Sequence, residues 1–204
     1  VYVLLLADNI SNVLPTVRSR SMSFSFRSDY DSKMQSWLLD QINSSDFKNI
    51  DDMKFYWNIS GRAPLSFISS YNSGGFDQQN WLVSKLLEVI NNNFDVWEII
   101  NKWLTESLPL SWVLDAMYFI LLDILKIYSF GSNKDIKGFL YNKGFENLIL
   151  SASEKCDFTC VNNMIKKVEG FKAGVLNPAS IHDDLMIEGV LIDWTFVLLK
   201  QEVI

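Results

Sequence analysis

The chain has 204 residues, of which 49% are hydrophobic and 21% are charged. This composition is that of a globular protein and excludes a largely disordered chain. The formal net charge of −6 also argues against a domain whose whole surface binds phosphate backbones, because non-specific affinity for nucleic acids comes from lysine and arginine. With 14 Phe, 7 Trp and 7 Tyr, the chain has enough apolar area for one domain or two small ones.

Two strands are predicted, both near the beginning of the chain. The apolar run over residues 1–6 is typical of a buried strand, and residues 21–26 alternate between serine and the apolar Met22, Phe24 and Phe26. Two strands without neighbours would leave unpaired edges and bury little area. We therefore expect the rest of a sheet to lie upstream of this sequence.

Three short helices are predicted next. Residues 28–32 offer N-cap side chains for a helix through Met34, Leu38 and Ile42. A second helix is predicted over about 50–56, and Gly61-Arg62-Ala63-Pro64 opens a third. The stretch Asn72-Ser73-Gly74-Gly75 then reads as a linker, because glycines tolerate unusual backbone angles.

Everything beyond this linker is predicted to be helical. Apolar residues recur at helical spacing from Trp81 to Ile90 and from Val96 to Leu104. Further helices are expected over 111–130, after Asn133, over 145–172 with a break near Asp157, and from Asn177-Pro178 to Leu198.

The span over 108–130 is the most apolar of the chain, but it contains Asp115, Asp123 and Lys126. Charges at the centre of a bilayer are costly, so a buried central helix explains the span better than a membrane helix does. No leader peptide is recognised at the beginning, where the apolar run lacks a basic flank. We expect a cytoplasmic chain that does not enter the membrane.

The residues suited to catalysis or to metal binding are few. Cys156 and Cys160 are four residues apart, and His182 is the only histidine. Both cysteines lie in a segment predicted to be helical and therefore share a face, but with one distant histidine they are too few for zinc. We expect reduced thiols, with a redox pair as the alternative. His182-Asp183-Asp184 fits a helix start, and no phosphate-binding Gly-x4-Gly-Lys motif is present.

The first 21 residues combine an apolar run, a polar turn and a short basic motif. Asn9 lies in the turn, and Leu14-Pro15-Thr16 precedes Ser19-Arg20-Ser21. This segment resembles the end of the ATPase core in clamp-loader subunits of bacterial DNA polymerase III, which are AAA+ proteins. There a strand carries a polar sensor-one residue, matched here by Asn9, and a Ser-Arg-Cys motif follows, in which Ser21 replaces the cysteine.

The resemblance implies that Arg20, with Ser19 in its motif, points into the ATP site of a neighbouring subunit. A guanidinium has a fixed fork of donors that suits phosphate oxygens, and supplied in trans it stabilises charge on a transferring phosphoryl group. Residues 60–65 are similar to the start of the last helix of the lid domain, with Arg62 at the sensor-two position. Residues 110–125 and 176–198 are similar to helices of the delta-prime collar.

The resemblance thus implies membership of the delta-prime family, whose members act as the stator of the loader. Such a subunit binds the gamma/tau and delta subunits, meets DNA only within the assembled complex, binds no cofactor of its own and is not itself an enzyme. Aromatic residues such as Trp57, Trp81 and Trp97 would either contact these partners or belong to the core. The alternatives are a gamma/tau-type motor with its own ATP site upstream and an unrelated helical interaction domain.

The expected fold class is mainly α. Residues 1–26 are predicted to be the end of an α/β AAA+ core, residues 27–74 a three-helix lid, and residues 75–204 a helical collar that assembles with other subunits.

Overall fold

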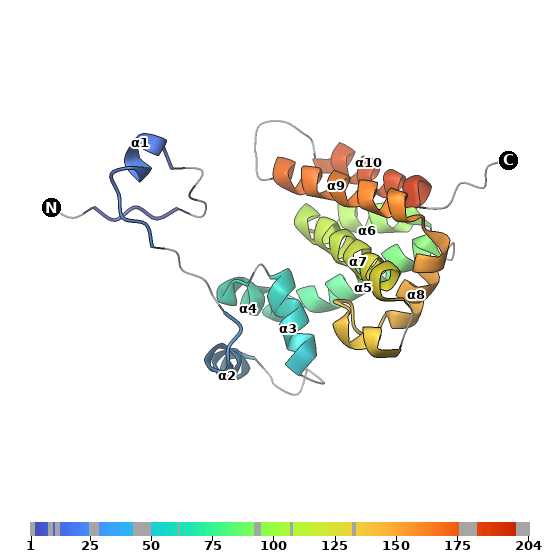
Figure 1. The fold of residues 1–204 in the computed structure, drawn as a ribbon, viewed down its shortest axis with the longest axis horizontal. Helices are drawn as coiled ribbons and strands as arrows, with labels where there is room; N and C mark the ends of the chain where they lie inside the picture. The colour runs from blue at the N-terminus through green and yellow to red at the C-terminus, as the bar shows by residue number, and fades with distance from the viewer. Residues whose placement is uncertain are drawn as a thin grey trace.

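The structure, a computed structural model, describes residues 3–7, 10, 13–24, 29–42, 50–60, 62–91, 95–106, 108–131, 134–175 and 183–198. These residues form ten α-helices and one 3₁₀ helix, so the mainly α prediction is confirmed (Figure 1). The elements are α1 (Pro15–Arg18), α2 (Ser32–Gln41), α3 (Ile50–Ile59), α4 (Pro64–Asn72), α5 (Gly75–Ile90), α6 (Val96–Glu106), α7 (Leu110–Phe130), η3 (Lys134–Phe139), α8 (Glu146–Lys155), α9 (Phe158–Val175) and α10 (Asp183–Leu198).

The two predicted strands are wrong for the described residues 3–7 and 21–24, which have no regular structure. A strand needs a neighbour that accepts and donates its backbone hydrogen bonds, and no described segment pairs with these residues in this way. The side chain of Leu4 is 91% exposed, and Val3 and Leu6 are similarly open to solvent. Between the two segments lies the short helix α1, which the sequence did not predict.

Helices α2, α3 and α4 enclose a small hydrophobic core. Leu38, Trp57 and Phe67 are fully buried there, and the ring of Tyr30 lies 5.8 Å from that of Trp57. Asp31 begins α2, because its carboxylate accepts a hydrogen bond from the backbone N–H of Met34 at 2.8 Å. Trp57, 1% exposed, therefore belongs to the core and does not offer surface to a partner.

The predicted linker over 72–75 is a tight turn between α4 and α5. Gly74 has a φ of 70°, and its N–H donates to the carbonyl of Tyr71 at 3.1 Å. Gly75 is buried at the start of α5, and a Cβ on this residue would collide with the ring of Trp112 on α7. Gly74 is needed for its left-handed backbone angle, and Gly75 is needed because Trp112 lies so close to it. Neither role requires a flexible chain.

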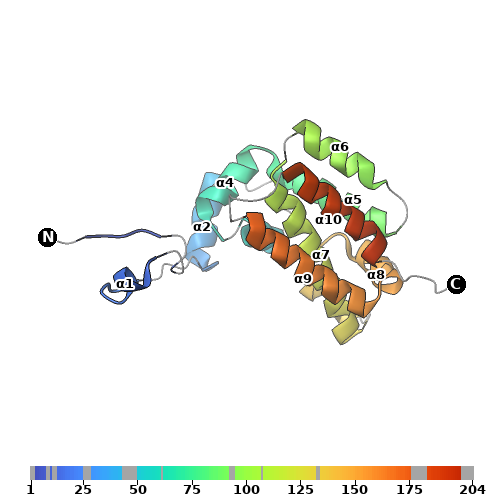
Figure 2. The same cartoon turned by 90° about the horizontal axis from the view of Figure 1, so that it is seen from above.

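The buried side chains of the remaining helices form a second, larger hydrophobic core. Helix α7 lies in its middle and packs against α5, α8, η3 and α9, while α10 packs against α5, α6 and α9 (Figures 1 and 2). Helix α7 ends at Gly131, whose φ is 73°. The prediction of a buried central helix over 111–130 is confirmed. The predicted start of the last helix at 177–178, and His182, lie outside the described residues.

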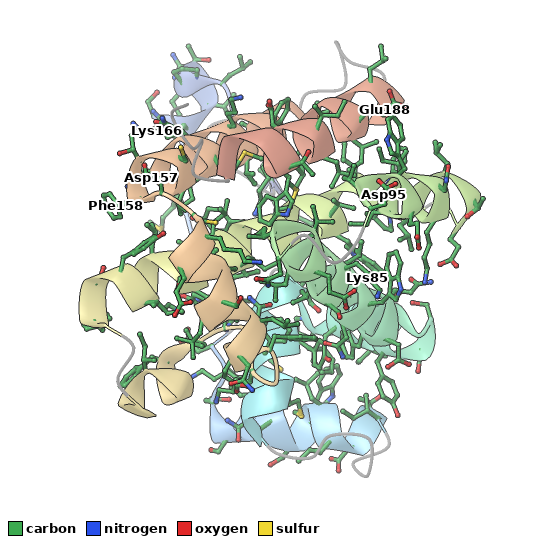
Figure 3. The ribbon with its side chains drawn as sticks, turned by 90° about the vertical axis from the view of Figure 1, so that its right-hand side faces the viewer. Lys85, Asp95, Asp157, Phe158, Lys166 and Glu188 are labelled. Carbon is green, nitrogen blue, oxygen red and sulfur yellow. The ribbon has the colours of Figure 1, made fainter. Side chains whose placement is uncertain are left out.

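The helix predicted over 145–172 breaks near Asp157, as expected. Helix α8 ends at Lys155, and α9 begins at Phe158 after Asp157, whose carboxylate accepts hydrogen bonds from the N–H groups of Thr159 and Cys160 at 2.9 and 3.3 Å (Figure 3). Because of this break, the expectation that Cys156 and Cys160 share one helix face is wrong. Neither forms a disulfide bond, and Cys156 is buried.

Candidate functional site

The predicted trans-acting arginine lies just after α1. Pro15 begins this helix, where its missing N–H is not needed. Ser19 ends it, and the hydroxyl of Ser19 donates to the carbonyl of Thr16 at 3.1 Å. Arg20 follows in a turn, is exposed, and forms no ion pair with the described residues. No described residue therefore forms an ion pair with its guanidinium, whereas the hydroxyl of Ser19 is used locally.

The surroundings of α1 agree with this exposure. Figures 1 and 2 both show α1 and residues 3–7 away from the other helices. No side chain of α1 is buried. Asn9, the sensor-one-like residue, lies outside the described residues. The structure thus places Arg20 at the surface but does not describe the residue that was expected to accompany it.

Arg62 is the only described non-glycine residue with a positive φ, of 59°. Its N–H donates to the carbonyl of Trp57 at 3.0 Å, which closes the end of α3 in the manner of a Schellman turn. The residue is exposed. It lies between α3 and α4, while Arg20 follows the separate α1, so the described residues do not bring these two arginines into one site.

A buried carboxylate that the sequence analysis treated only as part of an apolar helix organises one side of the larger core. Asp123 on α7 is fully buried and accepts hydrogen bonds from Tyr141 N and Asn142 N, both at 2.8 Å. Asn142 Nδ2 and Lys126 Nζ donate to it as well, each at 2.9 Å. Desolvation lowers the pKa of Lys126, although Asp123 opposes this shift. Four donors satisfy the carboxylate, so we assign it a structural role.

A second polar contact joins α7 to α9. Asp115 Oδ1 lies 2.6 Å from Lys172 Nζ, and this ammonium also lies 4.8 Å from the ring centre of Tyr118. Burial raises the pKa of the Asp115 carboxyl, and Lys172 opposes the shift. The hydroxyl of Tyr118 donates to Glu169 at 3.2 Å. These groups hold one helix against another.

The C-terminal end of α5 is tied to α8 in a similar way. Asn91 Nδ2 donates to the carbonyl of Leu148 at 3.2 Å, and the hydroxyl of Ser151 donates to Asn91 Oδ1 at 2.7 Å. Lys155 Nζ donates to the carbonyl of Asn91 at 2.7 Å. Directly after α8, the hydroxyl of Tyr128 donates to the carbonyl of Cys156 at 2.8 Å. Burial raises the pKa of this tyrosine to about 12.

Within the described part of the chain, no three His, Cys, Asp or Glu side chains are grouped so that they could hold a metal ion. The same residues include no helix long and apolar enough to cross a membrane.

Helices α6 and α10 expose several large apolar side chains, although apolar residues at helical spacing are expected to be buried. Leu104 belongs to the periodic apolar pattern over 96–104 but is exposed, and so is Leu185 of α10. Trp97 precedes Leu104 by seven residues, and Ile192 follows Leu185 by seven. A spacing of seven places two residues on one helix face, so the sequence did contain the signal for a second apolar stripe on each helix.

Comparison with known proteins gives no assignment: no protein-family model matches the chain, and no curated protein shows significant similarity to it.

Proposed function

We propose that this chain is a stator-type subunit of a bacterial clamp loader, similar to the delta-prime family, and that it offers Arg20 to an ATP bound by a neighbouring subunit. The observation that carries the proposal is the position of Arg20. It is exposed after α1, forms no ion pair with the described residues, and follows a helix that stands apart from the other helices (Figure 1).

The chemistry of this arrangement suits a group that acts on another subunit. A guanidinium is always charged and presents several donors in one plane, which match the oxygens of a phosphate. An arginine supplied by a second protein stabilises the charge that develops as the γ-phosphoryl group is transferred. An arginine with an acidic neighbour in its own chain would have to break that pair first. Arg20 has no such pair among the described residues.

The two hydrophobic cores also support the proposal. One contains buried residues of α2–α4, and the other contains those of α5–α10. A small helical lid followed by a larger helical collar is the order implied by the resemblance. In the proposed assembly the gamma/tau and delta subunits are the partners, ATP is bound by the neighbour, DNA is met only by the complete loader, and the complex acts in the cytoplasm.

The test is reconstitution of the chain with purified gamma/tau and delta subunits from the same source. We expect a stoichiometric complex on size exclusion. In that complex Arg20→Ala lowers single-turnover ATP hydrolysis at the adjacent site by ~10-fold or more, since trans-acting arginines contribute at least this much. Arg18→Ala is the matched control, because it removes the same charge two residues away and should leave the rate unchanged.

Two results would overturn the proposal. One is the absence of any complex when circular dichroism shows a folded chain, which would favour an unrelated helical interaction domain. The other is an equal loss of activity in the Arg18 and Arg20 variants, which would indicate a general charge effect.

A further inference from the structure

Helices α6 and α10 pack against each other, and each exposes large apolar side chains. Four large side chains make up this α6–α10 face; the exposed fractions are 53% for Trp97, 48% for Leu104, 67% for Leu185 and 40% for Ile192. Each helix contributes two of them, seven residues apart, so the apolar stripe on each helix is about two turns long. Large apolar side chains grouped in this way mark an interaction site more often than scattered single ones do.

The stripe on α6 is distinct from the side of this helix that packs on the core. Ile99, Ile100 and Trp103 are buried, and Trp97 and Leu104 lie beside Ile100 along the helix. Lys102 is on the opposite flank, where its ammonium lies 3.9 Å from the ring centre of Trp81 on α5. Trp97 and Leu104 therefore lie on the flank of α6 that is turned away from α5.

The stripe on α10 is likewise separate from the contacts of this helix with the core. Ile187, Leu191 and Trp194 are buried. Asp193 forms an ion pair with Lys167 of α9 at 2.9 Å, which places that flank of α10 next to α9. Leu185 and Ile192 lie on the outward side, away from both the core and α9. Figure 2 shows α6 and α10 as neighbours.

The charges around the face are negative. Glu98 on α6 and Glu188 on α10 form no ion pair with the described residues. Asp95, which precedes α6, accepts the N–H of Trp97 at 3.0 Å, and Figure 3 shows it on the same side of the molecule as Glu188. Lys102 is the only lysine or arginine of these two helices. Its Nζ lies 3.8 Å from Glu106 Oε1 and also contacts the face of the Trp81 ring.

We propose that the α6–α10 face binds an amphipathic helix of a partner protein, whose apolar stripe is flanked by lysine or arginine. Paired helices form a groove in which the apolar positions i, i+3, i+4 and i+7 of a third helix can pack. Basic flanks on that helix would face Glu98, Glu188 and Asp95, and this complementarity sets both orientation and association rate.

The same charges argue against other occupants. A second copy of this chain would bring one set of carboxylates against an identical set, and like charges across an interface are costly. Anionic lipid surfaces and nucleic acids attract basic segments and would repel this face. The inference goes beyond the proposed function, because it specifies the chemistry of a partner at a surface that does not include Arg20.

The test measures fluorescence anisotropy of two labelled peptides with the full chain. Each peptide is a helix of about 18 residues, or five turns, with leucines at i, i+3, i+4 and i+7. One carries lysines on both flanks of the stripe and the other carries glutamates. We expect at least about tenfold tighter binding of the lysine peptide at low salt, and a smaller preference at about 0.5 M salt, where surface charges are screened.

Variants locate the binding on the chain. Replacing Leu104 and Leu185 together by serine should weaken binding of the lysine peptide at least about tenfold, because apolar anchors carry most of the affinity of such interfaces. Leu65→Ser is the matched control, since Leu65 is 76% exposed on α4, outside this face. Glu98→Lys with Glu188→Lys should reverse the preference between the two peptides. Circular dichroism checks that each variant is folded.

Equal affinity for the two peptides, or equal weakening by Leu65→Ser, would overturn the proposal. It would also be overturned if sedimentation showed a dimer that the Leu104 and Leu185 variant dissolves, because the occupant would then be a second copy. The peptide assay contains no ATP and no loader subunit. A negative result in the peptide assay therefore says nothing against the proposed role of Arg20, and a negative result in the loader assay says nothing against the proposed α6–α10 face.

Discussion

Replacing Asp123 by alanine should be the most damaging single change to a polar side chain in the larger core. The fully buried carboxylate accepts hydrogen bonds from two consecutive backbone N–H groups, those of Tyr141 and Asn142, and from two side chains. It thereby fixes the segment after η3 against the middle of α7. Alanine removes every acceptor at once and leaves the donors in place.

The size of the effect follows from the burial of those donors. The N–H and the Nδ2 of Asn142 are buried, and each donor left unsatisfied costs about 1–3 kcal/mol. Lys126 has a side chain that is 22% exposed and also donates to the carbonyl of Phe139, so it can turn to water at little cost. We expect Asp123→Ala to lower the free energy of unfolding by about 3 kcal/mol, near the lower end of values for broken buried pairs.

Chemical denaturation followed by far-UV circular dichroism measures this loss, and amide hydrogen exchange localises it. The N–H groups of Tyr141 and Asn142 should exchange much faster in the variant. Asp115→Ala is the matched control, because it lies eight residues earlier on the same helix and forms one partly exposed ion pair, with Lys172. We expect this control to cost about 1 kcal/mol or less.

The reasoning would be refuted by equal losses in the two variants. It would also be refuted if Asp123→Ala kept the Asn142 amide protected.

Two further comparisons test the packing. Gly75→Ala should lower the free energy of unfolding by about 1–3 kcal/mol, because its Cβ would clash with Trp112. Gly189→Ala should raise this free energy by about 0.5–1 kcal/mol, because nothing lies within 4 Å of the added Cβ. Thermal denaturation measures both changes, and a stabilised Gly75→Ala protein would contradict the predicted contact with Trp112. Trp194→Phe should cost about 1 kcal/mol because its buried N–H donates to the backbone of α5. Trp103→Phe removes the same volume but should cost less than Trp194→Phe, because the buried N–H of Trp103 has no acceptor among the described residues; urea titration measures the difference.

The central helix shows what the sequence predicts well. Apolar residues on nearly every side of 111–130 indicated burial, and the acidic residues among them excluded a membrane span. Gly131 then marked the end of the helix. Such signals are local, because they depend on the spacing of residues within one element. The break near Asp157 was predictable for the same reason, since a carboxylate there can begin a new helix.

Long-range contacts account for the errors. Gly74-Gly75 is predicted to be a linker, but the sequence cannot show that Trp112, 37 positions after Gly75, requires the missing side chain. The apolar residues 3–6 have the composition of a buried strand, but a strand depends on a neighbour that the sequence does not specify. The partners of Asp123 lie 18 and 19 residues away across a loop, so only its burial within an apolar helix was foreseeable.

The polar and charged side chains differ in whether they have a partner within the chain, and this difference decides how well their roles could be predicted. Polar side chains of the helical body, such as Asp123, Asn91 and Asp115, accept or donate hydrogen bonds within the chain. Their role is visible once the fold is known. Arg20 and Glu188 instead form no ion pair with the described residues. Such a surface group would not have to break an ion pair with the described residues in order to act on another molecule. Both proposals therefore concern binding to a partner protein.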